Sequence, residues 1–238
     1  MNNRRTNCGN CQRVFPQMNI GSKYICQCSA EICSICGYTF HNDYTCFYYL
    51  TQCDFQIIDL QQQVSDPSLH AILQYYLNQV RVLFESGKGG GNLRFVRAQA
   101  IVNKPLEVRY AAKKACMAGQ CGGRERVNEV FLWHGSAESN YNPIARDGLK
   151  VAGVDLPPGG QGYGLGIYSG NATTASGHTK GSKWLLLFQG MKGNNSPSTI
   201  TTIPQLNNGQ THSFTAGDIT VFFTKEQILP RYLIEFSN

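Results

Sequence analysis

The chain has 238 residues, a formal net charge of +6, 42% hydrophobic residues and only 15% charged residues. This composition excludes a disordered chain, and the cations are spread too thinly for the basic stripe of a nucleic-acid-binding protein. No apolar run reaches the length of a membrane span, and the polar first residues lack the apolar segment of a signal peptide. We therefore expect a soluble intracellular protein, cytoplasmic or nuclear, with no membrane partner.

Seven of the ten cysteines fall within residues 8–46. With one histidine they give eight potential metal ligands in four closely spaced pairs: Cys8, Cys11, Cys26, Cys28, Cys33, Cys36, His41 and Cys46. Four thiolate or imidazole ligands supply the tetrahedral geometry of structural zinc, so the pattern predicts two zinc ions. A disulfide framework is the alternative, which the histidine and the odd number of cysteines disfavour.

The spacing of these eight ligands resembles the in-between-RING zinc domain and departs from it in the two-residue spacing of the first pair. The resemblance implies that the first four ligands hold one zinc ion and the last four hold the other. In RING-between-RING ubiquitin ligases this domain stands between a module that docks the conjugating enzyme and one that carries the catalytic cysteine. Neither is recognised here, so residues 1–50 are interpreted as a scaffold or interaction module.

Residues 54–85 place apolar side chains at helical spacing, which predicts one helix, or two helices divided near Pro67. Four glycines follow within residues 86–91. This segment lacks the order of a phosphate-binding loop, in which the lysine comes after the glycines. We interpret residues 51–91 as a helical connector and linker that ends at a domain boundary.

From residue 93 onward, short apolar runs alternate with connectors rich in glycine, proline and asparagine, which predicts an α+β domain with a mixed or antiparallel sheet over residues 92–238. Residues 105–117 are expected to form an amphipathic helix inside it. The runs expected to form strands are residues 93–102, 130–135, 164–170, 184–190, 218–224 and 231–236.

Four segments of this part carry a resemblance to a known family. They are IVNKPLEVRYAAKKACM (101–117), LWHGSAESNYNPIARDGLKVA (132–152), PPGGQGYGLGIYSGNATTASGHT (157–179) and ILPRYLIEF (228–236). In this order they resemble the first strand and helix, the nicotinamide-binding strand, the donor loop with its following motif, and the last strand of the ADP-ribosyltransferase domain of poly-ADP-ribose polymerases. The resemblance implies that the domain binds NAD as its substrate.

The same resemblance implies roles for particular residues. His134 is expected to bond the adenosine ribose, and Gly135 to pair its backbone with the nicotinamide carboxamide. Ser136 is expected to contact the ribose region, and Tyr168 to stack on the nicotinamide ring. Ser176 is expected to form a hydrogen bond with the amide of nicotinamide. Thr179 stands where the family often has a second stacking tyrosine, and His178 and His212, which match nothing in the family, are interpreted as exposed polar residues.

Polymerising members of the family place a glutamate just before the Tyr-Leu-Ile of the last strand, where this chain has Arg231. The expected catalytic triad is therefore His134, Tyr168 and Arg231. An arginine cannot accept a hydrogen bond from a ribose hydroxyl or stabilise positive charge. The sequence thus favours transfer of single ADP-ribose units to a protein, to the chain itself or to a nucleic acid, and leaves open an inactive module that binds NAD or ADP-ribose.

Overall fold

The structure is a computed structural model that describes residues 23–25, 31–33, 53–65, 67–157, 162–206 and 209–238. Its first described elements are two short antiparallel strands, β1 (Lys23–Ile25) and β2 (Glu31–Cys33). Cys33 ends β2, and the other seven expected zinc ligands lie outside the described residues. The two-zinc module therefore stays a prediction from the sequence.

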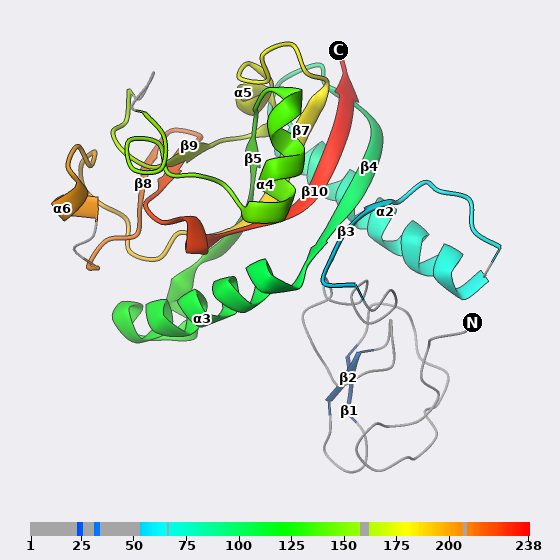
Figure 1. Ribbon diagram of the computed structural model, residues 1–238, viewed down its shortest axis with the longest axis horizontal. Helices are drawn as coiled ribbons and strands as arrows, with labels where there is room; N and C mark the ends of the chain where they lie inside the picture. The colour runs from blue at the N-terminus through cyan, green and yellow to red at the C-terminus, as the bar shows by residue number, and fades with distance from the viewer. Residues whose placement is uncertain (1–22, 26–30, 34–52, 66, 158–161, 207–208) are drawn as a thin grey trace.

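A five-stranded antiparallel sheet forms the centre of the part that the structure describes (Figure 1). Its strands follow the order β3-β4-β10-β7-β5, so the last strand of the chain lies in the middle. The strands are β3 (Phe55–Asp59), β4 (Arg94–Asn103), β5 (Glu129–His134), β7 (Trp184–Met191) and β10 (Ile228–Ser237). The expected α+β class with antiparallel strands is confirmed.

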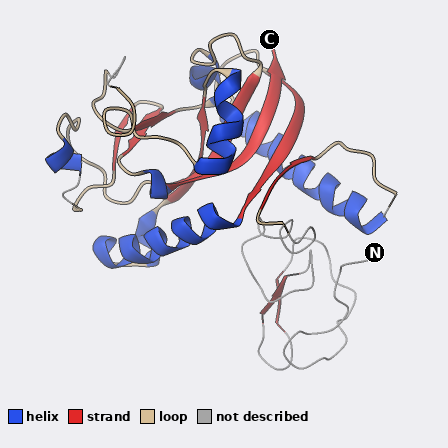
Figure 2. Ribbon diagram, viewed as in Figure 1, coloured by secondary structure: helices blue, strands red, loops and turns tan. Residues whose placement is uncertain are grey.

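A smaller three-stranded antiparallel sheet stands beside the end of β5 (Figure 2). It contains β6 (Ile167–Ser169), β9 (Ile219–Phe222) and β8 (Ser213–Ala216) in the order β6-β9-β8. Trp133 on β5 and Gly170 after β6 exchange both backbone hydrogen bonds, at 3.0 and 3.1 Å. This isolated bridge joins the two sheets at the place where the expected nicotinamide-binding residues lie.

Helix α2 (Pro67–Gly87) covers one face of the large sheet and confirms the second half of the predicted helix (Figure 1). Its buried side chains recur at helical spacing: Ile72, Leu73, Tyr76, Leu77, Val80 and Phe84. They share one core with Leu187 of β7 and Ile234 of β10. The burial of such apolar side chains contributes about 1.5–3 kcal/mol each, so α2 is an integral layer of this domain.

The first half of the predicted helix is wrong, because residues 55–59 form the edge strand β3, paired with β4. The glycine-rich segment also differs from a free linker: Thr173 donates a hydrogen bond to the carbonyl of Lys88, and Gly89 adopts φ +68° beside Asn171. The elements before and after the expected boundary at residue 91 also pack in one core.

Asn103 connects two helices on the other side of the sheet. Its side chain accepts the backbone N–H of Leu106 at 3.0 Å and so caps α3 (Lys104–Cys121). Its amide nitrogen donates to the carbonyls of Ala145 and Arg146, both at 2.8 Å, at the end of α4 (Tyr141–Asp147). The remaining helices of the described residues are η2 (Arg124–Val127), η3 (Glu138–Asn140), α5 (Ala172–Ser176), α6 (Ile203–Leu206) and η4 (Lys225–Gln227).

Candidate functional site

A cleft of about 700 Å³ opens between the end of β5, helix α4, strand β6 and helix α5. Its volume falls in the range of small-molecule sites, roughly 300–1,000 Å³. The residues expected to bind NAD that line it are His134, Gly135, Ser136 and Tyr168. The structure thus brings together four of the six residues to which the sequence assigned a catalytic or NAD-binding role.

His134 ends β5 and is fixed by one hydrogen bond, between its Nδ1 and the backbone carbonyl of Tyr168 at 2.8 Å. Because a carbonyl only accepts, Nδ1 carries the proton, and Nε2 of the neutral ring remains an acceptor. Burial lowers the pKa of His134 from its ordinary value, against the bond to Tyr168, and the charge of nearby His178 lowers it further. The cleft therefore offers a neutral imidazole with an acceptor nitrogen.

Gly135 follows directly and lies against helix α5. A Cβ at this position would overlap the carbonyl oxygen of Ala175 and would lie 2.9 Å from its carbon. Glycine is therefore required for β5 and α5 to approach each other. The same approach leaves the Gly135 backbone at the surface of the cleft.

Ser136 is held by the start of the next helical segment. Its backbone N–H donates to the hydroxyl of Tyr141 at 3.1 Å, and its Oγ accepts from Asn140 at 2.9 Å. Tyr141 in turn donates to the carbonyl of Trp184 at 2.5 Å, and burial raises the pKa of Tyr141 to about 12. These bonds fix the turn after β5 without occupying every acceptor position of the Ser136 hydroxyl.

Tyr168 lies on β6 and lines the same cleft as the histidine. Its hydroxyl donates to the carbonyl of Gly164 at 2.8 Å and accepts the backbone N–H of Tyr163 at 2.9 Å. Burial raises the pKa of Tyr168, so its hydroxyl stays protonated at neutral pH. The ring is thus fixed at its far end by the loop that precedes β6, which is the expected donor loop.

The side chains of Ser176 and Thr179 are hydrogen-bonded to backbone carbonyls of α5. The Ser176 hydroxyl donates to the carbonyl of Thr173 at 2.7 Å, within α5, and Thr179 is 4% exposed and donates to the carbonyl of Ser176 at 3.0 Å. Neither residue is among those that line the cleft in the described part of the chain.

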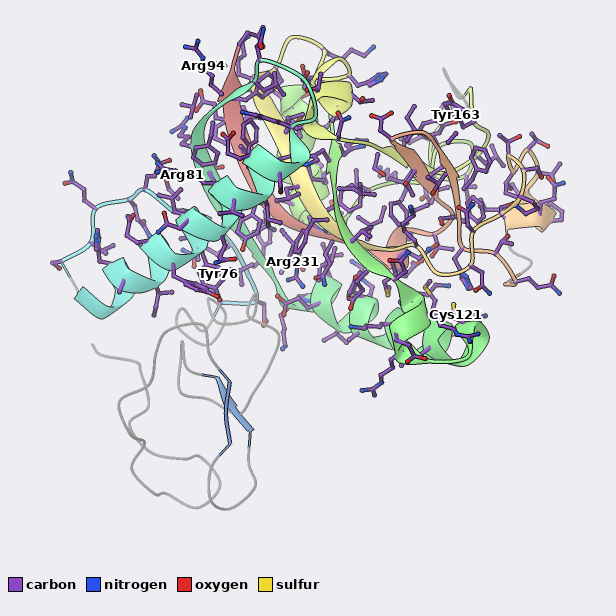
Figure 3. The ribbon with its side chains drawn as sticks, turned by 180° about the vertical axis from the view of Figure 1, so that it is seen from behind. Tyr76, Arg81, Arg94, Cys121, Tyr163 and Arg231 are labelled. Atoms are coloured by element: carbon purple, nitrogen blue, oxygen red, sulfur yellow. The ribbon has the colours of Figure 1, made fainter. Side chains whose placement is uncertain are left out.

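Arg231 is also not in the cleft. It is 3% exposed, and its guanidinium donates to Gln189 Oε1 at 2.9 Å and to Glu107 Oε1 at 3.5 Å. Figure 3 shows it near the start of α3, well apart from Tyr163 of the donor loop. The register of β10 against β7 shifts between Pro230 and Tyr232, so Arg231 sits in a bulge. The expectation that Arg231 is the third residue of the triad is therefore wrong.

The strand that lies beside β6 is β9 rather than β10, and its residue in the cleft is Ile219. Asp218, directly before it, accepts a hydrogen bond from Thr174, which also lines the cleft. Sequence reasoning missed both residues because it placed the third position on the last strand. Asp218 and Ile219 can be assigned to the cleft only when β9 is known to pair with β6, where Ser169 lies opposite Thr220.

The rim of the cleft carries charges of both signs, from Lys150, Lys180 and Asp147. Two lysines suit a ligand with a diphosphate, which attracts cations. Lys180 has a left-handed backbone with φ +55°, a conformation that non-glycine residues adopt rarely. His178 is exposed, as expected, and lines the same cleft.

His212, expected to be exposed, is buried. Its Nδ1 accepts the backbone N–H of Asn194 at 3.1 Å, and its Nε2 lies 3.0 Å from Gln120 Oε1. Burial lowers the pKa of His212, and the charge of Lys113 adds to the effect. Through these bonds His212 holds α3 against the segment that leads into β8.

Among the described residues, no three or more histidine, cysteine, aspartate or glutamate side chains come together as a metal-binding group. Likewise, none of the helices described is both long and apolar enough to cross a membrane.

The two sheets and the cleft at their junction define an α+β domain with a cleft of the size that small-molecule sites have. The family model of the poly(ADP-ribose) polymerase catalytic domain matches residues 76–197, which is just over half of the chain, and the chain belongs to this family. It is also 36% identical over 53 residues to poly [ADP-ribose] polymerase 1 of Danio rerio. That alignment covers 22% of this chain and 5% of the relative.

Proposed function

We propose that the chain is an NAD-dependent ADP-ribosyltransferase that transfers single ADP-ribose units and releases nicotinamide. The observation that carries the proposal is the shared cleft of His134, Gly135, Ser136 and Tyr168. Its neutral histidine, free glycine backbone and fixed tyrosine are the groups that the family resemblance assigns to NAD. Two lysines at the rim suit the diphosphate of the same substrate.

The residues act mainly by holding NAD and by their electrostatic effect. Nε2 of His134 accepts a hydrogen bond from a ribose hydroxyl, and the Gly135 backbone pairs with the carboxamide. Tyr168 packs against the nicotinamide ring. Cleavage of the bond between nicotinamide and ribose creates positive charge on the sugar, so a rigid orientation and nearby negative charge lower the barrier.

Ile219 favours single transfers over polymerisation. Its apolar side chain cannot accept a hydrogen bond from the ribose or activate an acceptor hydroxyl. Among the described residues that line the cleft, the only carboxylate is Asp147, at the rim. In the proposed reaction the acceptor completes the site with a negatively charged group. This group is a carboxylate when the acceptor is a protein target or the chain itself, and another anion when the acceptor is the end of a nucleic acid.

The alternative is a catalytically inactive module that binds NAD or ADP-ribose. It is favoured by the same Ile219, which leaves the reacting ribose without a carboxylate from the chain. In either case the cysteine-rich residues 8–46, with two predicted zinc ions, are proposed to recruit the partner.

Incubation with labelled NAD separates the two functions. The enzyme is expected to release nicotinamide and to give single ADP-ribose additions to itself or to an added protein, without ladders. Calorimetry measures NAD binding in the same preparation. Binding without nicotinamide release supports the inactive module, and ladders of polymer contradict the proposed single transfer.

A further inference from the structure

Next to Gly135 the cleft is lined by residues of the turn that follows helix α5, including His178 and Lys180. The turn of residues 177–181 follows α5 and is fixed by hydrogen bonds from His178 N to the Ala175 carbonyl at 3.0 Å and from Ser182 N to the Thr179 carbonyl at 3.1 Å. These bonds turn Thr179 inward, where its hydroxyl is held by Ser176. The turn therefore exposes the residue before Thr179 to the cleft.

That residue is His178. Its backbone lies against Gly135, since a Cβ on the glycine would be 3.2 Å from the His178 carbonyl carbon. Its side chain is exposed, lines the cleft and influences the protonation of His134 electrostatically. His178 thus stands beside the two residues to which the proposed function assigns the carboxamide and the ribose.

We propose that His178 is a specificity residue that places its imidazole ring against the nicotinamide group of NAD. This inference rests on the proposed function, because it requires nicotinamide beside Gly135. The nicotinamide ring of NAD is cationic, and the imidazole ring offers it an aromatic face. Tyr168 and His178 then enclose the ring from β6 and from the turn, and Thr179 is a packing residue.

Loss of the contact between His178 and the nicotinamide ring should weaken the binding of NAD but not the binding of ADP-ribose. ADP-ribose keeps the adenosine, the diphosphate and both riboses of NAD but lacks nicotinamide. His178→Ala should weaken NAD binding about tenfold, which corresponds to the usual strength of such an aromatic contact. It should leave ADP-ribose binding unchanged, and His178→Phe should restore NAD binding because it restores the aromatic face.

Calorimetry on the full chain with NAD and with ADP-ribose tests this assignment. His70→Ala, an exposed histidine on α2, is the matched control and should change neither affinity. Unchanged NAD binding in His178→Ala, or equal losses for both ligands, would overturn the role of His178 and leave the proposed function standing. If the unaltered chain binds neither ligand, the proposed function fails first. If His178→Phe binds NAD as weakly as His178→Ala, the aromatic contact is refuted.

Discussion

The guanidinium of Arg231 is paired with the carboxylate of Glu107, with 3.5 Å between Nη1 and Oε1, beneath the first turns of α3. Both side chains are buried, at 3% and 8% exposure. Gln189 accepts from the same guanidinium and donates to Glu129 at 3.1 Å, and Lys114 and Tyr110 of α3 bond that second carboxylate. Arg231 therefore attaches α3 to the centre of the sheet.

We expect Arg231→Glu to lower the free energy of unfolding by about 3–5 kcal/mol, because it places two carboxylates together in the interior. Chemical denaturation measures the loss. Glu85→Gln, which breaks the exposed pair of Glu85 with Lys88, is the control and should cost less than about 1 kcal/mol. The double variant Arg231→Met with Glu107→Gln should be more stable than Arg231→Glu. Wild-type stability of Arg231→Glu would contradict the buried pair.

Ile219→Glu should raise nicotinamide release from NAD by about tenfold or more, because it adds a carboxylate beside the positive charge that develops on the ribose. Nicotinamide release is measured against Val108→Glu, an exposed apolar position on α3 outside the cleft. If both variants release nicotinamide at the wild-type rate, the absence of a carboxylate at Ile219 is not what limits the reaction.

Gly135→Ala should destabilise the domain by about 1–3 kcal/mol and reduce NAD affinity, since the added methyl group forces β5 away from Ala175. Gly119→Ala provides a matched control within α3, where a Cβ meets no atom within 4 Å. That control should stabilise the chain by about 0.5–1 kcal/mol. Thermal unfolding and calorimetry separate the two variants, and equal behaviour would refute the close approach.

His134→Ala should abolish NAD binding, whereas Glu235→Ala should leave it unchanged. His134 lines the cleft, while Glu235 on β10 pairs with Arg97 at 2.5 Å on the exposed side of the sheet. Calorimetry with NAD compares the two variants. Equal losses from both would show that the cleft is not the NAD site.

Acid should destabilise the domain through His134, because its pKa is lower in the folded chain than in the unfolded chain. The unfolded chain then binds the proton first, so the free energy of unfolding is highest above about pH 6.5 and falls as the pH drops through that value toward the folded pKa. His212 contributes in the same direction. His134→Asn should make the acid-induced loss smaller, and an unchanged pH profile would contradict a lowered pKa for His134.

Zinc analysis tests the cysteine-rich segment. Protein purified under reducing conditions should contain two zinc ions per chain, and chelation should unfold residues 8–46 while the α+β domain stays folded. The finding of no zinc would remove that prediction.

Much of the fold is readable from local sequence patterns. The runs within residues 93–102, 184–190 and 231–236 become β4, β7 and β10, because long apolar runs bounded by turn residues favour buried strands. The strand β3 was missed since Phe55–Asp59 is short, and its apolar residues also fit a helix; pairing with β4 decides its structure.

The site was readable only in part. His134, Gly135 and Tyr168 stand in motifs of fixed spacing, and these motifs reach the cleft together. The places of Arg231 and Ile219 depend on long-range strand pairing: β9 pairs with β6 beside the cleft, whereas Arg231 lies in the bulge of β10. His212 is buried through contacts with Gln120, 92 residues away, which no local pattern reveals.

Asn103 bonds the start of α3 and the last carbonyls of α4 with a single side chain. Opening of either helix end removes contacts that position this shared side chain, so the amide protons of the two ends are expected to exchange with solvent cooperatively. Since α4 forms a wall of the cleft, a ligand that protects its amides from exchange will also slow exchange at the first turn of α3. The protection pattern measured by hydrogen–deuterium exchange will therefore extend beyond the residues that touch the ligand.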